Sequence, residues 1–186
     1  MIGFAMCGSY CTHRVALEQL RLLVESEKEV QPIVSENVYQ TDTHFGTSDA
    51  LKKRLIELCG CPLIHTIVQA EPLGPKHPLD ALVICPCTGN TLAKIALGIT
   101  DTAVTMAAKA HLRSDRPLVI ALASNDALSA NLKNIGLLLS RKSVFFVPMT
   151  QDDPEKKPHS LVADFSLLLP TLEWAKKGKQ YQRIFL

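Results

Sequence analysis

The sequence predicts an α/β fold in which a parallel sheet lies between two layers of helices. Short segments that are apolar on both faces alternate with segments of helical periodicity along the whole chain, a pattern typical of three-layer parallel sheets. At 186 residues, the chain is long enough for one substantial core and too short for two. We therefore expect a single domain that spans residues 1–186.

The strands are predicted from their apolar runs, and the run ALVIC is the clearest central strand. Ser48 is the expected N-cap of a helix that Gly60 closes. Residues 64–68 are ambiguous, and the proline-rich segment 71–78 cannot be a regular helix. The predicted strands are 2–7, 30–34, 81–85, 118–123 and, as the last, 144–147.

The remaining helices are predicted from periodicity and from breakers. Asn90 is a candidate N-cap for a helix over 91–97 that Gly98 ends. Asp101 is a candidate N-cap for the next helix, which ends at residue 112. Pro170 should kink or divide the C-terminal helical segment. The other helices are predicted over 15–23, from 124 to about 140, and over about 160–178.

Composition excludes several classes of protein. With 47% hydrophobic and 20% charged residues, the chain is not expected to be disordered. A net charge of +2 and an aromatic content of 5% argue against a nucleic-acid binder. We find no signal-peptide pattern and no membrane-length apolar run, so we expect a cytoplasmic protein. The CxC spacing of Cys59/Cys61 and Cys85/Cys87 indicates small buried residues rather than metal ligands.

Small polar residues follow each predicted parallel strand. Gly8 and Ser9 follow the first, Ser35 the second, the segment 86–91 the third and the segment 123–126 the fourth. Parallel strands end at one edge of the sheet, and ligands bind at that edge. Glycine, hydroxyl groups and helix N-termini suit one phosphate group. The dinucleotide-binding motif GxGxxG and the P-loop motif GxxxxGK[ST] are absent. Each of these loops, taken alone, would also serve as an ordinary helix cap or turn.

The run PCTGNTLAKIALGITDTAVT resembles the signature PxTxNTxxKxAxGxxDxxxT of the flavoprotein family that includes the homo-oligomeric flavin-containing cysteine decarboxylases. Segments such as TDTHFG, AEPLGPKHPLD and VPMTQDDPEKKPHSLVA are similar to one group of that family, the B subunits of dipicolinate synthases. The first resemblance covers roughly residues 1–150, and the second covers nearly the whole chain.

The resemblance implies a flavodoxin-like (Rossmann-like) fold with FMN across the carboxyl edge, in a homo-oligomer built on trimers. It further implies a partner, the A subunit of dipicolinate synthase, that holds NADP, and oxidation of a dihydrodipicolinate-type precursor to dipicolinic acid in sporulation. In this interpretation Gly8, Ser9 and Ser35 hold the phosphate, and Phe45 covers the flavin ring. The residues expected at the ribityl chain or the ring are Thr88, Gly89 and Asn90.

The sequence departs from the decarboxylase pattern at two places. The histidine of that pattern falls on Pro72, and PxMNxxM becomes LASNDAL, which keeps only Asn125. We therefore do not expect oxidative decarboxylation of a cysteinyl peptide. The alternatives to a dipicolinate synthase subunit are an FMN-dependent decarboxylase or flavin prenyltransferase of the same fold, or a non-catalytic assembly subunit.

Candidate catalytic and substrate-binding residues remain among the histidines and the groups that suit carboxylates. His44 and His77 are candidate acid/base residues in loops. Asn125 and Arg113 are candidate contacts for the carboxylates of a dicarboxylic acid. His13 and His111 are expected to be surface or helix-end residues.

Overall fold

A computed structural model describes residues 1–27, 29–74 and 76–186. Five strands of its sheet run parallel in the order β2–β1–β3–β4–β5, which is the strand order of the flavodoxin-like fold that the resemblance implied. These strands are β1 (Ile2–Met6), β2 (Val30–Val34), β3 (Ala81–Cys87), β4 (Leu118–Ser124) and β5 (Val144–Phe146).

Two short strands extend this sheet beyond the predicted ones. They are β6 (Met149–Thr150) and β7 (Leu161–Ala163), which pair antiparallel to each other. β7 also pairs antiparallel with the carboxyl end of β4, next to the part of β4 that β5 pairs with. The prediction that residues 144–147 form the last strand is therefore wrong, because two- and three-residue strands carry no usable periodicity.

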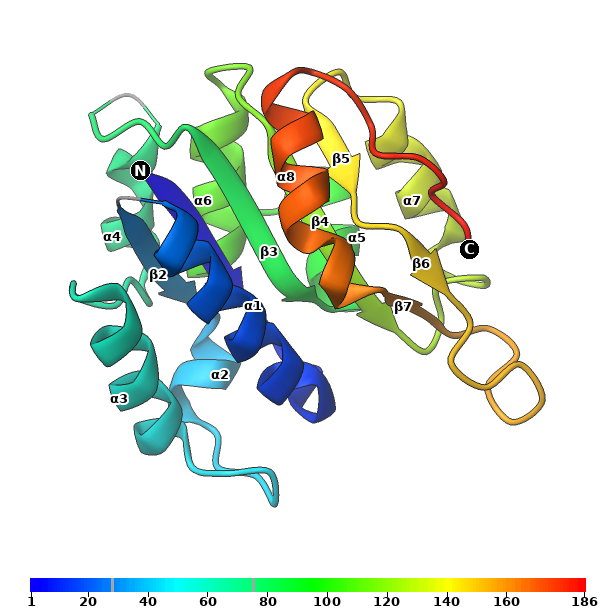
Figure 1. The fold of residues 1–186 in the computed structure, drawn as a ribbon, viewed down its shortest axis with the longest axis horizontal. Coiled ribbons are helices and arrows are strands. Elements are labelled where there is room, and N and C mark those ends of the chain that lie inside the picture. Colours follow the sequence, from blue (N-terminus) through cyan, green and yellow to red (C-terminus); the bar gives the residue numbers. More distant parts are fainter. Residues whose placement is uncertain (28, 75) are drawn as a thin grey trace.

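Helices cover both faces of the sheet, as Figure 1 shows. α1 and α8 pack on one face, and α5, α6 and α7 pack on the other, so the sheet separates two hydrophobic clusters. This arrangement confirms the three-layer prediction. The helices are α1 (His13–Ser26), α2 (Glu36–Gln40), α3 (Ser48–Cys59), α4 (Ile67–Ala70), α5 (Gly89–Leu97), α6 (Ala103–Leu112), α7 (Leu132–Leu139) and α8 (Leu168–Lys176).

The central strands are buried because they are apolar throughout. Every residue of β1 and β3 is buried, and so is β4 up to Ala123. A strand with no polar face can only be accommodated between two layers of helices. Because these strands are parallel, the loops after β1, β2, β3 and β4 all emerge at the carboxyl edge of the sheet.

The helix starts differ from the predicted caps by one or two residues. Thr47, Thr88 and Thr102 cap α3, α5 and α6 through their hydroxyl groups, in place of Ser48, Asn90 and Asp101. In each case a threonine lies close to the predicted residue and has the extended backbone that a cap requires. Asp101 instead forms an ion pair.

Two longer helix predictions are also corrected. The helix expected from Ser124 begins only at Leu132, because residues 125–131 form turns. The C-terminal helix begins at Leu168, so Pro170 lies in its first turn, where a missing N–H costs no hydrogen bond. Pro170 therefore neither kinks nor divides that helix. Within the described residues, we find no helix with the length and apolar character needed to cross a bilayer.

Candidate functional site

The loop after β1 contacts the loop after β3. The Cys7 N–H donates to the Pro86 carbonyl at 3.1 Å, and a Cβ added to Gly8 would lie 3.5 Å from Cγ2 of Thr88. Ser9 adopts a left-handed backbone with φ of 69° and makes no capping bond with its side chain. Its hydroxyl group therefore accepts no hydrogen bond from a backbone N–H at the start of the following 3-10 helix.

The loop after β2 joins the same cluster. The Ser35 N–H donates to the Met6 carbonyl at 3.0 Å, and the Ser35 hydroxyl caps α2 by accepting from the Val38 N–H at 3.5 Å. The Tyr10 hydroxyl donates to the Asn37 carbonyl at 3.1 Å. Side chains and backbone groups that follow β1, β2 and β3 are thus held together at one edge of the sheet.

The loop after β3 requires a glycine. A Cβ on Gly89 would lie 2.4 Å from Oγ of Ser124 and 2.7 Å from both Oδ1 of Asp126 and Nδ2 of Asn131. The buried Gly89 therefore lets the start of α5 pack directly against the turn that follows β4. Asn90, the next residue, is exposed at this edge.

The turn after β4 is built around one carboxylate. The Ser124 hydroxyl donates to Asp126 at 2.5 Å, and the Asn131 amide donates to both oxygens of Asp126 at 3.0 and 2.9 Å. These bonds, with that from Ser124 the largest cause, lower the pKa of the Asp126 carboxyl. Asn125 is exposed between these partners, at the edge where it was predicted to meet a ligand.

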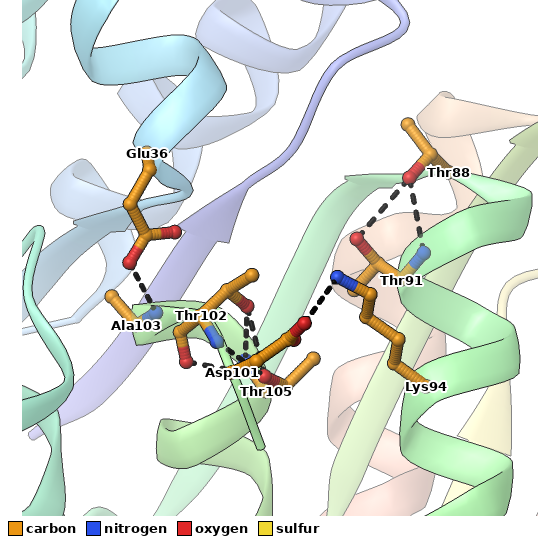
Figure 2. A network of polar contacts seen from close by, with 8 residues as sticks. All are labelled: Glu36, Thr88, Thr91, Lys94, Asp101, Thr102, Ala103 and Thr105. Carbon is orange, nitrogen blue, oxygen red and sulfur yellow. Dashed lines mark hydrogen bonds and ion pairs between the residues drawn. The ribbon is translucent and has the colours of Figure 1, made fainter. Parts of the chain in front are cut away.

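The residues of the family-like signature form a network between α2, α5 and α6, which Figure 2 shows. Thr88 Oγ1 donates to Thr91 Oγ1 at 3.2 Å and accepts from the Thr91 N–H. Lys94 Nζ lies 2.9 Å from Oδ2 of Asp101, which orients the loop between α5 and α6. The lysine and the aspartate of the signature therefore have a structural role here.

Glu36 completes this network from the other side, and the sequence analysis missed it. Its Oε1 accepts from the Ala103 N–H at 3.1 Å, at the start of α6. Its Oε2 is buried and has no hydrogen-bond partner among the described residues. Its position directly after Ser35 was the available signal, since a side chain at the start of a helix after a parallel strand reaches the ligand-binding edge.

A cleft of about 520 Å³ lies between the start of α1, the 41–47 segment and α3. Thr43 and Gly46 exchange backbone hydrogen bonds of 3.0 Å, which makes the segment a tight turn. Phe45 at its tip lines the cleft and is 57% exposed, and the His44 ring packs on it with centroids 3.9 Å apart. The turn therefore presents an aromatic side chain and an imidazole near the predicted phosphate loops.

Two predicted site residues lie elsewhere. His77 is exposed in the loop before β3, and its N–H donates to the Pro72 carbonyl at 2.8 Å. Arg113 is the exposed C-cap residue of α6, close to the start of β4. Both residues are at the amino edge of the sheet, so one chain does not bring them to the loops that contain Ser9, Ser35 and Thr88.

His13 is the first residue of α1 and His111 lies in the last turn of α6, which confirms that both are at helix ends, but both side chains are buried rather than on the surface. His13 Nε2 lies 2.8 Å from the Cys7 carbonyl, and His111 Nε2 lies 2.9 Å from the Pro117 carbonyl. Burial lowers the pKa of both imidazoles, and the bonds to the carbonyls oppose that shift. Helical spacing was the available signal, because His111 follows Val104 and Ala107 on the buried face of α6.

Three of the six cysteines are core residues, whereas Cys59 and Cys61 are only partly buried and Cys11 is exposed, so the predicted burial holds for Cys85/Cys87 and only in part for Cys59/Cys61. Cys7, Cys85 and Cys87 are buried, and burial raises the pKa of the Cys7 thiol to about 11. All six cysteines are free thiols. Across residues 1–27, 29–74 and 76–186, no group of three or more His, Cys, Asp or Glu side chains is arranged to hold a metal ion.

The chain is similar to known proteins over its whole length. Residues 2–164 match the flavoprotein family. The B subunit of dipicolinate synthase of Bacillus subtilis is 46% identical over 185 residues, which cover 100% of this chain and 92% of that protein. The crystal structure of the dipicolinate synthase B subunit from Bacillus halodurans superposes with a TM-score of 0.91 at 43% identity, covering 100% of this chain and 95% of that one.

A second kind of relative shares the family. Flavin prenyltransferase UbiX of Pseudomonas aeruginosa is 30% identical over 159 residues, which cover 79% of this chain and 75% of that protein. The match to the flavoprotein family and the similarity to the two B subunits agree with the α/β fold and with the small polar residues at the carboxyl edge of its sheet. The chain therefore belongs to the flavoprotein family, and within that family to the group of dipicolinate synthase B subunits.

Proposed function

We propose that the chain binds FMN at the carboxyl edge of the sheet. The observation that carries this proposal is the convergence of the loops after β1, β2 and β3, where the Cys7 N–H bonds to Pro86 and the Ser35 N–H bonds to Met6. Gly8, Ser9 and Ser35 would hold the phosphate. Thr88, Gly89 and Asn90 would contact the ribityl chain or the ring, and Phe45 would cover the ring.

The chemistry of these groups fits one phosphate. They are backbone N–H groups, the hydroxyl groups of Ser9 and Ser35, and the N-terminal end of α5, all of which favour an anion. Ser9 has a left-handed backbone, and a left-handed residue in a turn can direct successive N–H groups to one side, an arrangement that binds anions. A pyrophosphate is disfavoured because the dinucleotide glycine pattern is absent.

The proposed activity is that of a dipicolinate synthase B subunit. It would act with the A subunit of that enzyme, which would hold NADP, and oxidise a dihydrodipicolinate-type precursor to dipicolinic acid in sporulation. Bound FMN supplies hydride-accepting chemistry. The names and identities of the two Bacillus relatives support this assignment. We further propose a homo-oligomer built on trimers.

The chain's own residues would bind and orient the substrate. Asn125 is exposed at the carboxyl edge, where its amide could donate to a carboxylate. His44 is exposed on the turn that carries Phe45, and it is our candidate for moving a proton. Arg113 and His77 are at the amino edge, so they would take part only if a neighbouring protomer supplied them.

The proposal is tested with purified protein in two steps. A visible absorption spectrum with flavin bands supports FMN binding, and a colourless protein that does not take up added FMN refutes it. The chain is then mixed with the A subunit, NADP and the precursor, and dipicolinate is measured. We expect product only when both proteins are present. Product with a colourless chain identifies an assembly role, and prenylation of FMN or decarboxylation of a cysteinyl peptide by the chain alone contradicts the assignment.

A further inference from the structure

The cleft under the 41–47 turn has two cationic side chains in its lining. Its volume of about 520 Å³ is within the range of small-molecule sites. Arg14 of α1 and Arg54 of α3 line it, whereas none of its lining residues is Asp or Glu. Among the described residues, no ion pair joins either guanidinium to a carboxylate.

This lack of a partner is unusual for the cations of these two helices. Arg21, two turns after Arg14 on α1, pairs with Glu18 and Glu25. On α3, Lys52 pairs with Asp49 at 2.7 Å. The same two helices therefore neutralise other cations and leave positive charge at the cleft, where it would attract an anionic ligand.

The remaining wall suits a flat ring. Leu17 of α1, Leu51 of α3 and Phe45 of the turn provide apolar surface. Tyr10 also lines the cleft, and its ring is 4.0 Å from where a Cβ on Gly8 would be. The cleft thus adjoins the loop that is proposed to hold the FMN phosphate.

We propose that this cleft is the substrate subsite and that it binds a planar ring bearing two carboxylates, with Arg14 and Arg54 each contacting one of them. A guanidinium presents paired donors that match a carboxylate, and an apolar wall accepts the ring face. The proposal rests on the proposed function for the identity of the dicarboxylate. It assigns the carboxylate contacts to Arg14 and Arg54 in place of Asn125, which does not line the cleft, and of Arg113, which is at the amino edge.

The test is calorimetric titration of the FMN-loaded protein with pyridine-2,6-dicarboxylate as the probe. We expect Arg14→Gln and Arg54→Gln each to weaken binding at least about tenfold, since each removes charge-assisted hydrogen bonds. The double variant should show no measurable binding. Arg21→Gln, on the same helix as Arg14 but outside the cleft, is the matched control and should bind as the unsubstituted chain does. Pyridine-2-carboxylate, which has a single carboxylate, should bind more weakly than the dicarboxylate.

Four results would overturn the inference. Binding could be absent in the unsubstituted protein, or be unchanged in both arginine variants. Loss of the probe in Asn125→Ala with retention in the arginine variants would place the substrate at the turn after β4. Release of FMN by the probe would show that the cleft holds the flavin itself. In each case the flavin spectrum of the unsubstituted protein tests FMN binding, and so the proposed function, independently of the probe. Circular dichroism verifies that the substitutions leave the fold intact.

Discussion

Gly89 gives the sharpest prediction about how the site is built. In Gly89→Ala the new methyl group would lie 2.4 Å from Oγ of Ser124 and 2.7 Å from Asp126 and Asn131, closer than Cβ atoms approach other groups. The turn after β4 must then move, because α5 is fixed by its packing on the sheet. Overpacking of this kind costs about 1–3 kcal/mol. In a chain of this size that cost lowers Tm by about 2–12 °C.

Gly136 is the matched control. It is also helical, in α7, but a Cβ there would meet no atom of the described residues within 4 Å. Gly136→Ala should therefore stabilise the protein by about 0.4–1 kcal/mol, through helix propensity and a less flexible unfolded chain. Thermal and urea unfolding of both variants measures the two signs. If Gly89→Ala is as stable as the unsubstituted chain, the close contact between α5 and the turn after β4 is wrong.

Three further predictions concern the cap of α2, a buried histidine and the cysteine thiols. Ser35→Ala removes the N-cap of α2 and should cost about 1 kcal/mol in urea unfolding, while FMN titration should show weaker binding; unchanged FMN affinity would remove Ser35 from the phosphate site. Burial lowers the pKa of His111 in the folded protein, so below about pH 6.5 the unfolded chain binds a proton there that the folded protein does not. The free energy of unfolding should therefore fall with decreasing pH, and more steeply than in His111→Gln. Equal pH dependence of the two proteins would contradict the lowered pKa. In native protein, iodoacetamide should label the exposed Cys11 and spare Cys85, whose burial raises its thiol pKa well above the usual value; labelling of Cys85 at the rate of Cys11 would contradict that burial.

The central sheet could be predicted from the sequence because its strands are apolar on both faces. The same topology predicts that the loops after β1, β2 and β3 lie together. The turn after β4 could not be predicted in this way. Ser124, Asn125 and Asp126 are typical of helix starts and of turns alike, since their side chains bond to nearby backbone in both. In the structure, the hydrogen bond from the Asn131 amide to Asp126 closes this segment into a turn, and that contact is not visible in the local sequence.

The cleft also lay beyond the sequence pattern. Arg14 and Arg54 are far apart in the chain and look like ordinary exposed helix residues, and only the packing of α1 beside α3 brings them to one surface. Conversely, Arg113 and His77 have the chemistry of site residues, but they occur in segments that end at the amino edge. The type of each residue indicated what chemistry it could perform, whereas the helix or loop in which it lies determined whether it reaches the site.

A comparison of FMN with riboflavin tests the phosphate site most directly, because riboflavin has the same ring and ribityl chain and lacks the phosphate. Flavin fluorescence titration of the purified chain gives both dissociation constants. If backbone N–H groups and the hydroxyls of Ser9 and Ser35 hold the phosphate, FMN should bind at least about 100-fold more tightly, equivalent to about 2.7 kcal/mol. Equal affinity for the two flavins would contradict the phosphate site at the carboxyl edge.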